Sequence, residues 1–237
     1  MGIEEKLREI IHHHLSVVLE YNPFERFDGI SDKESFLEMI GNDPAFAPFF
    51  LDNPKYVTAR IGGNLITSLH RKLGDMYEEI FKTLLADKFQ IPEEELSYSL
   101  ILNIDGKLQK RSTDGMIKYS SLSKKDKFRL RNFISEDSKG MGFEVRSCYQ
   151  IGDSKRIQAD RDMALALKKE GIDPVMLIFC TSSLKSPVKR LAEFWTIFEG
   201  ENTFGFIRGL TGFDLYSFLH GEHKMIHNLV GQIFGMM

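Results

Sequence analysis

Cysteine is scarce in this sequence, since Cys148 and Cys180 are the only two among 237 residues. Their spacing fits neither a zinc-ligand pattern nor a disulfide framework, which favours a reducing compartment. Apolar runs are short as well, and none approaches the roughly 20 residues that a membrane span requires. We therefore expect a cytoplasmic protein without a membrane partner.

An excess of positive charge is also missing, because 31 Lys and Arg residues face 34 Asp and Glu residues. Binding to nucleic acid must then be argued from local patches. The phosphate-loop pattern GxxxxGK[ST] does not occur, so no nucleotide cofactor is expected. His223 and His227 lie one helical turn apart, but the segment HKMIH lacks the glutamate of the HExxH zinc motif, and a polar helix face is the simpler interpretation.

The composition, with 42% hydrophobic and 27% charged residues, is typical of a globular protein that buries one large core. We predict a single domain over 1–237. Within it we expect an N-terminal helical elaboration over 1–60, a core over 61–182 and a C-terminal helical region over 183–237.

Hydrophobic periodicity and turn residues predict an α/β (α+β) fold, with a mixed β-sheet flanked by helices. In the N-terminal part we expect a helix over 3–20, a short helix capped at Ser31–Glu34 and ending at Ile40, and a helix from about Leu65 to Phe89 after Gly62-Gly63. These are followed by a hairpin over 97–121 that turns at Asp105-Gly106 and by a helix over 123–137. A strand, helix and strand between Gly142 and Ser182, a helix over 186–200, and two or three short C-terminal helices complete the expected order.

The stretch from Gly142 to Ser182 carries the candidate chemistry. Alternation along its first strand puts Glu144 and Arg146 on one face, away from the apolar residues that precede each of them. Along the following helix, Asp160 falls inside the buried apolar arc. A buried carboxylate needs a charged partner or a metal ion, so this stretch predicts a functional site.

This arrangement resembles the PD-(D/E)XK nuclease superfamily, and within it the type II restriction endonucleases. In that family an acid at the end of one strand and an E-x-K motif on the next hold magnesium at the scissile phosphate. The corresponding residues here are Asp114 in RSTDG and Glu144-Val145-Arg146. Arg146 stands where the family usually has lysine, and Thr113 where it often has proline. The resemblance covers roughly residues 60–182 and implies a restriction-endonuclease-like αβββαβ core with extra N- and C-terminal helices.

The resemblance implies a Mg²⁺ site formed by Asp114 and Glu144, joined by Glu78 from the preceding helix. A turn or bulge at Asp114-Gly115 explains Asp114 equally well, because Asp is disfavoured inside a strand. For Glu78, a solvated helix face is the commoner explanation.

Arg146 cannot act as a general base, because its pKa stays above about 12. It would instead hold the phosphate, with Asp160 as its anchor. Lys155, expected on the loop after the strand, is the candidate replacement for the family's catalytic lysine. The predicted catalytic residues are therefore Asp114, Glu144, Arg146 and Lys155.

Positive residues far outnumber acids between Lys107 and Arg131. Such a run is usually a solvated face, but beside a phosphodiester site it favours phosphate contacts. Exposed polar positions on the helix before 170 could reach base edges or phosphates. The DNA-binding candidates are Lys124, Lys125, Lys127, Arg129, Arg156, Gln158 and Arg161.

Together with the resemblance, these residues predict a Mg²⁺-dependent type II restriction endonuclease that cleaves double-stranded DNA at a specific site. The expected homodimer follows from the resemblance alone. Because arginine replaces the usual lysine, the alternative is a DNA-binding or structural protein on a catalytically inactive nuclease scaffold. A nuclease acting on RNA is a weaker alternative.

Overall fold

The computed structural model of the protein describes residues 1–25, 27–104, 106–131, 133, 135, 137–149 and 154–237. The chain divides into two compact units. The first comprises Met1–Ile10 with Gly74–Gly221, and the second Ile11–Leu73 with Glu222–Met237. The single-domain organisation with boundaries after 60 and 182 stays a prediction.

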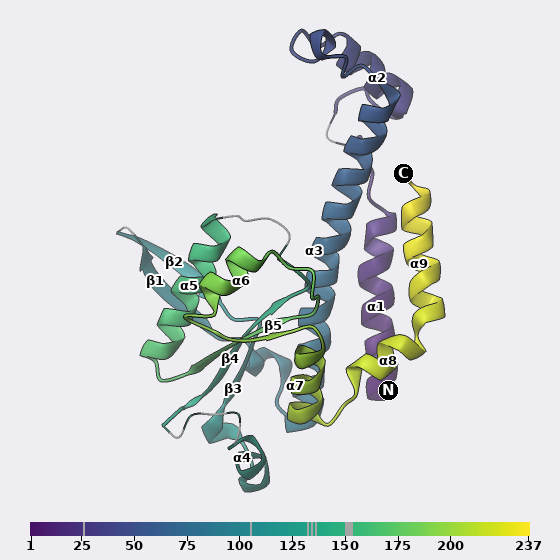
Figure 1. The fold of residues 1–237 in the computed structure, drawn as a ribbon. Helices are drawn as coiled ribbons and strands as arrows, with labels where there is room; N and C mark the ends of the chain where they lie inside the picture. Colours follow the sequence, from purple (N-terminus) through teal and green to yellow (C-terminus); the bar gives the residue numbers. More distant parts are fainter. Residues whose placement is uncertain (26, 105, 132, 134, 136, 150–153) are drawn as a thin grey trace. The chain divides into compact units, whose positions relative to one another are not determined.

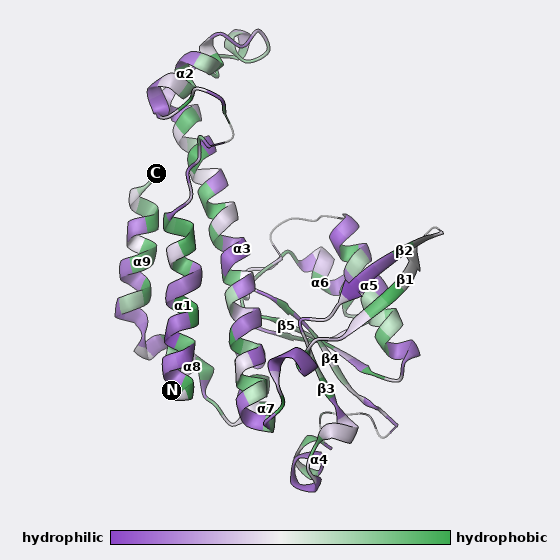
Figure 2. Cartoon of the chain, turned by 180° about the vertical axis from the view of Figure 1, so that it is seen from behind, coloured by the Kyte–Doolittle hydropathy of each residue, from purple (hydrophilic) through white to green (hydrophobic). Residues whose placement is uncertain are grey.

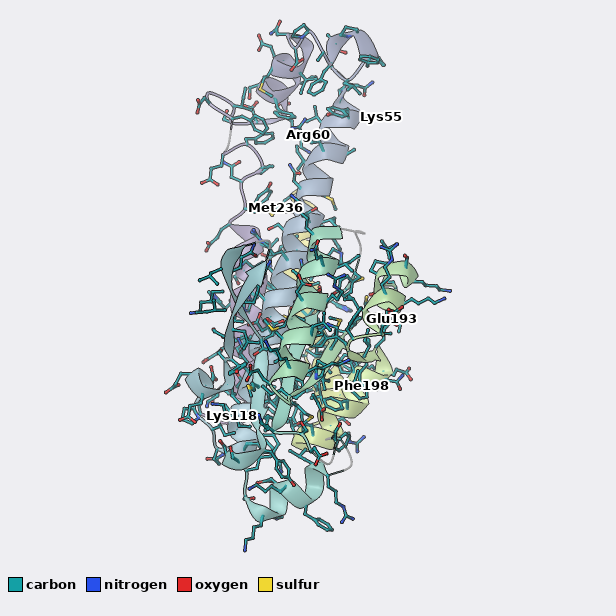
Figure 3. All side chains as sticks on the ribbon, turned by 90° about the vertical axis from the view of Figure 1, so that its left-hand side faces the viewer. Lys55, Arg60, Lys118, Glu193, Phe198 and Met236 are labelled. Carbon is teal, nitrogen blue, oxygen red and sulfur yellow. The ribbon has the colours of Figure 1, made fainter. Side chains whose placement is uncertain are left out.

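A mixed four-stranded sheet forms the centre of the first unit (Figure 1). Its strands, in spatial order, are β3 (Gly115–Lys118), β4 (Gly140–Arg146), β5 (Asp173–Ile178) and β6 (Thr196–Glu199). β3 runs antiparallel to β4, whereas β4, β5 and β6 run parallel to one another. Lys118 and Phe198 mark the two edge strands in Figure 3. The predicted class, a mixed sheet with helices, is confirmed, and the αβββαβ core stays a prediction.

Helices of the first unit cover both faces of this sheet (Figure 1). On one face lie α5 (Ser154–Lys169) and α6 (Lys185–Leu191), whose apolar side chains pack with Met176 and Ile178 of β5. On the other face lie α7 (Glu201–Thr211) and the C-terminal part of α3 (Pro54–Phe89). There the rings of Phe81 and Phe206 have their centroids 4.9 and 6.3 Å from that of Phe143. Because side chains alternate along β4, Glu144 and Arg146 face α5.

Gly142 allows α5 to lie close to β4. A Cβ atom at this position would be 2.9 Å from both terminal carbons of Leu167, which is fully buried. A larger residue at 142 would require the Leu167 side chain to shift within the core. The glycine therefore allows close packing of Leu167 of α5 against β4.

The predicted hairpin and the strand after it belong to two different sheets. β1 (Ser99–Ile104) and β2 (Lys107–Ser112) form a separate antiparallel pair, and the expected turn residue Asp105 lies outside the described residues. β1 is mostly hydrophobic and β2 mostly hydrophilic (Figure 2). The prediction that Asp114 lies within the second hairpin strand is wrong, because β2 ends at Ser112 and the chain then pairs with β4.

The predicted start of the long helix is also wrong. α3 begins at Pro54 rather than near Leu65, with Gly62 and Gly63 in its interior. Each interior glycine costs a helix only about 1 kcal/mol relative to alanine. Burial of Val57 and Ile61 in an apolar cluster offsets that cost, which the local sequence did not indicate.

Two further predicted helices are shorter than expected. α4 (Lys124–Leu130) begins after Ser123, whose side chain accepts a hydrogen bond from the Asp126 N–H, but it does not continue to 137. The segment 186–200 is not one helix, because α6 ends at Leu191 and Thr196–Glu199 forms β6. Pairing of β6 with β5 is a tertiary contact that overrides the local helical pattern.

The second unit is helical. It contains part of α1 (Ile3–Leu19), α2 (Lys33–Gly41), the first part of α3 and α9 (His223–Gly235). Asp32 caps α2 by accepting the Ser35 N–H at 2.8 Å, so the capping box begins one residue later than predicted. With α7 and α8 (Leu215–Gly221) of the first unit, α9 gives three short C-terminal helices, where the sequence predicted two or three. Short 3₁₀ turns occupy Ala47–Phe49, Glu93–Leu96 and Tyr119–Ser121.

In the part of the chain that the structure describes, no helix combines the length and apolar composition needed to span a membrane.

Candidate active site

Asp114, which directly precedes β3, lies beside Glu144 of the neighbouring strand β4. The Asp114 N–H donates to the Phe143 carbonyl at 2.9 Å, which continues the pairing of β3 with β4 by one residue. The Asp114 carboxylate in turn accepts the Val145 N–H at 2.8 Å. Two backbone contacts thus fix an acid from residue 114 beside the acid at 144. Where the sequence allowed a turn or bulge at Asp114-Gly115, the structure has a bend at Asp114, and β3 begins at Gly115.

Arg146 is the centre of the cluster. Its guanidinium donates to Asp114 at 3.2 Å, to Asp160 at 3.0 Å, and to Glu144. The side chains of Arg146, Glu144 and Asp160 are only 14%, 8% and 6% exposed, so water screens these ion pairs weakly. The predicted contact between Arg146 and Asp160 is present.

Asp160 is held by two further groups. The Tyr149 hydroxyl donates to its carboxylate, and the Trp195 indole N–H donates to its backbone carbonyl at 2.9 Å. Burial, followed by the neighbouring Asp160 charge, raises the pKa of Tyr149 well above its usual range. Tyr149 therefore stays a neutral donor, and Asp160 is a fixed acceptor for Arg146.

The cluster carries more negative than positive charge. Burial raises the pKa of Glu144 well above its usual value; Arg146 opposes this shift, while Asp114 and Asp160 add to it. Burial by itself would lower the pKa of Arg146, but Glu144, Asp160 and Asp114 outweigh it, and the pKa lies well above the usual value. Arg146 is therefore a permanent cation that cannot take up a proton from a nucleophile.

Glu78 of α3 belongs to the same electrostatic environment. Burial raises its pKa, Asp114 raises it further, and a salt bridge to Lys82 lowers it. The structure thus brings Glu78 within electrostatic range of Asp114 and does not leave it on a fully solvated face. Its role as a metal ligand stays a prediction.

Substituting Glu144 with Gln should stabilise the protein at neutral pH. Because the pKa of Glu144 is raised in the folded state, protonated Glu144 contributes favourably to the free energy of unfolding. This contribution is complete below about pH 4.5, the ordinary pKa, and is lost as the pH rises through the folded-state pKa. We expect Glu144→Gln to gain about 0.5–2 kcal/mol at pH 7, as is common when a strained functional site is relieved. Urea unfolding of both proteins between pH 4 and 8 measures this difference. A variant that is less stable than the wild type at pH 7 would contradict it.

A pocket of about 400 Å³ opens onto this cluster. Glu144, Arg146 and Asp160 line it together with Arg111 of β2 and with Lys155 and Arg156 of α5. Lys155 lies in the first turn of α5 and not on a loop as predicted. The positive end of the helix dipole adds to these cations. The pocket therefore combines acids at its base with cations around them.

Two guanidinium nitrogens near this pocket have unused hydrogen-bonding capacity. The Nε atoms of Arg111 and Arg146 are buried and have no hydrogen-bond partner among the described residues. An unpaired buried donor costs about 1–3 kcal/mol. Both belong to residues that line the pocket.

The other DNA-binding candidates lie elsewhere in the first unit. On α5, Gln158 is exposed, and the Arg161 guanidinium is 3.1 Å from the Asp162 carboxylate. α4, which carries Lys124, Lys125 and Lys127, follows the end of β3 that pairs with Gly140. Along β4, Gly140 is six residues, or about 20 Å, from Arg146. The side chain of Arg129 lies outside the described residues. α4 therefore does not line the pocket.

The donor groups fit a hard divalent cation. Among the described residues, no three His, Cys, Asp or Glu side chains are grouped as a ready metal site, and Arg146 contacts both Asp114 and Glu144. Mg²⁺, however, needs only one or two carboxylates and retains several waters. Burial is the main reason that the pKa of Glu144 is raised, and Asp114 and Asp160 add to the shift against the opposing effect of Arg146. A bound divalent cation would favour the ionised form of Glu144.

Sequence reasoning missed two residues of this site, Tyr149 and Arg111. Tyr149 was given no role from the sequence, and its partner Asp160 is eleven positions away along the chain. Arg111 was counted within the basic run but was not assigned to the site. The signal that could have identified it is its place on the strand that leads to Asp114.

Comparison of the chain with protein-family models, with curated proteins and with solved structures finds no match.

Proposed function

We propose that this protein is a Mg²⁺-dependent nuclease that hydrolyses phosphodiester bonds of double-stranded DNA. The observation that carries the proposal is that Arg146 joins Asp114 to Glu144, and that Glu144 and Arg146 line a pocket together with Arg111, Lys155 and Arg156. Acids bind a hard cation, and the surrounding cations attract a polyanion. A site that took a neutral substrate would have no use for both.

Each residue has a distinct task in this proposal. Asp114 and Glu144 hold Mg²⁺, which would supply activation of the attacking water and compensation for negative charge on the phosphate. Arg146, a permanent cation, binds a phosphate oxygen. Asp160 and Tyr149 keep the Arg146 side chain in place. Lys155 and Arg156 bind the flanking backbone.

Site-specific cleavage by a homodimer, as in the type II restriction endonucleases, is the finer part of the proposal. Its support is the resemblance in sequence, together with the chain order β3, β4, α5, β5, in which the three strands belong to one mixed sheet. In this order the two acids fall on adjacent antiparallel strands, and the helix after the second strand supplies Asp160.

A DNA-binding protein without catalysis is the second candidate. The observation that favours it is the contact of one guanidinium with all three carboxylates, Asp114, Glu144 and Asp160. If Arg146 serves only to neutralise these acids, the pocket binds phosphate and does nothing further.

Incubation with supercoiled plasmid and with a sequenced phage DNA separates the two candidates. We expect nicked and linear plasmid in Mg²⁺, discrete fragments from the phage DNA, and neither product in EDTA. In Ca²⁺ the protein should bind DNA without cutting it. Binding without cleavage in Mg²⁺ would favour the inactive scaffold, and no binding in either ion would overturn both.

The basic residues of α4 should add phosphate contacts outside the pocket. Replacing Lys124, Lys125 and Lys127 with Gln is expected to weaken binding to all DNA sequences and to reduce the salt dependence of affinity by about 0.9 in log–log slope for each phosphate that is no longer neutralised. Anisotropy of a labelled duplex in Ca²⁺ at several salt concentrations measures the slope. Lys168 and Lys169, exposed at the far end of α5, provide the matched control. An unchanged slope in the α4 variant would mean that this helix faces solvent.

A further inference from the structure

The two cysteines, which the proposed function does not use, lie next to each other in space. Cys148 follows β4 and Cys180 follows β5 by the same number of residues, and these strands are parallel with Arg146 opposite Ile178. The Phe179 N–H donates to the Arg146 carbonyl and the Cys180 N–H to the Ser147 carbonyl, both at 3.0 Å. The pairing thus continues past the strand ends and brings Cys148 beside Cys180.

One hydroxyl contacts both sulfur atoms. Ser183 Oγ lies 3.3 Å from Cys180 Sγ and 3.7 Å from Cys148 Sγ. Neighbouring strands are about 4.8 Å apart, and the Cα atoms of a disulfide are usually about 4.4–6.8 Å apart. The continued register therefore implies a backbone spacing that allows a disulfide once the side chains rotate. Both cysteines are partly exposed, so a small reagent can reach them.

The two thiols are not equivalent. Burial favours the neutral form of each, but hydrogen bonds with Cys148, Ser183 and Ser182 outweigh burial at Cys180 and lower its pKa. Burial and the hydrogen bond with Cys180 raise the pKa of Cys148. Cys180 is therefore the better source of thiolate, the form that attacks a disulfide. Tyr77, stacked on Phe179 at 3.8 Å between ring centroids, packs beside this site.

We propose that Cys148 and Cys180 form a thiol-modification site that closes to an intramolecular disulfide on reaction with a small disulfide such as oxidised glutathione. The Cys180 thiolate attacks one sulfur of the reagent, which forms a mixed disulfide and releases the first glutathione thiolate. The Cys148 thiol then loses its proton and attacks the Cys180 sulfur, which releases the second glutathione. The protein loses two electrons and two protons, and the reagent gains them as two thiols.

Such a bond is compatible with a reducing compartment. A partly exposed disulfide between adjacent strand ends belongs to the labile kind, which the glutathione pool can reduce again. The proposal stands on the geometry of the thiols and does not depend on nuclease activity.

The test uses the reduced full-length protein, folded and at low concentration to disfavour intermolecular reaction. After incubation with oxidised glutathione, free thiols are alkylated, and intact mass and peptide mapping are recorded. We expect loss of both alkylatable thiols, a mass lower by two hydrogens without bound glutathione, and a cross-link between the Cys148 and Cys180 peptides. Dithiothreitol should restore both thiols.

Single-cysteine variants resolve the order of reaction. Cys148→Ser should stop at a stable mixed disulfide on Cys180, and Cys180→Ser should react more slowly. The wild type unfolded in urea should accumulate glutathione adducts, because the strands no longer hold the thiols together. If the folded wild type accumulates adducts on either cysteine, forms disulfide-linked dimers, or keeps both thiols while the unfolded chain reacts, the proposal is overturned.

Discussion

Replacing Arg146 with alanine is expected to lower the free energy of unfolding by about 3–5 kcal/mol, the usual result of removing one member of a buried ion cluster. Arg146 is the cation that contacts Asp114, Glu144 and Asp160. Without it, three carboxylates with little exposure to water would face one another. Urea unfolding at pH 7 measures the change.

Two companion variants identify the cause. Arg161, on the same unit but 46% exposed and paired with Asp162, is the matched control, and Arg161→Ala should cost less than about 1 kcal/mol. Arg146→Ala combined with Glu144→Gln should recover part of the loss, because one of the three facing charges is removed. If Arg146→Ala unfolds within about 0.5 kcal/mol of the wild type, the cluster is not the electrostatic unit described above.

This instability determines how the catalytic role of Arg146 can be measured. A loss of cleavage in Arg146→Ala would not distinguish unfolding of the variant from loss of a catalytic group. Arg146→Lys keeps a positive charge among the carboxylates, and lysine is the usual residue in the family that the sequence resembles. We therefore expect this variant to remain folded and to retain part of the cleavage, with some loss because lysine lacks the planar guanidinium.

Substituting Asp114 with Asn, or Glu144 with Gln, should reduce Mg²⁺-dependent cleavage by at least about 10²–10³-fold, as for the loss of one group that stabilises charge in a transition state. Both changes keep the shape of the side chain. In Asp114→Asn, the new amide would still present an oxygen to the Val145 N–H, which Asp114 accepts at 2.8 Å, so the pairing of the strands should persist. Initial cleavage rates on plasmid at matched Mg²⁺ give the effect.

The control for these two variants is Asp162→Asn on α5. Asp162 pairs with Arg161 and, unlike Asp114 and Glu144, has no salt bridge to Arg146 among the described residues, so the cleavage rate of Asp162→Asn should equal that of the wild type. Binding to DNA in the absence of divalent ions should be as strong or stronger in Asp114→Asn and Glu144→Gln, because each removes a carboxylate from the cluster around Arg146. Wild-type cleavage by either variant would show that the strands β3 and β4 do not hold the metal.

Local patterns in the sequence were sufficient for the elements that surround Glu144 and Arg146. Strand alternation put these two residues on one face, and helical periodicity put Asp160 in a buried arc, and the structure has all three in contact. Both patterns depend only on neighbouring residues, whose side-chain directions are fixed by the backbone geometry of a strand or a helix. The three C-terminal helices were predictable for the same reason.

Only the tertiary structure decided how distant segments meet. The pairing of Asp114 with Glu144 depends on the register of β3 against β4, and no local period encodes that register. The same holds for Tyr149 and Trp195 against Asp160, for Arg111 at the pocket, and for Cys148 beside Cys180. It also holds for β6, where pairing with β5 replaced the expected helix, and for α4, which the sheet places at the end away from Arg146. In each case the sequence supplied the chemical groups, and packing and strand order decided which of them are in contact.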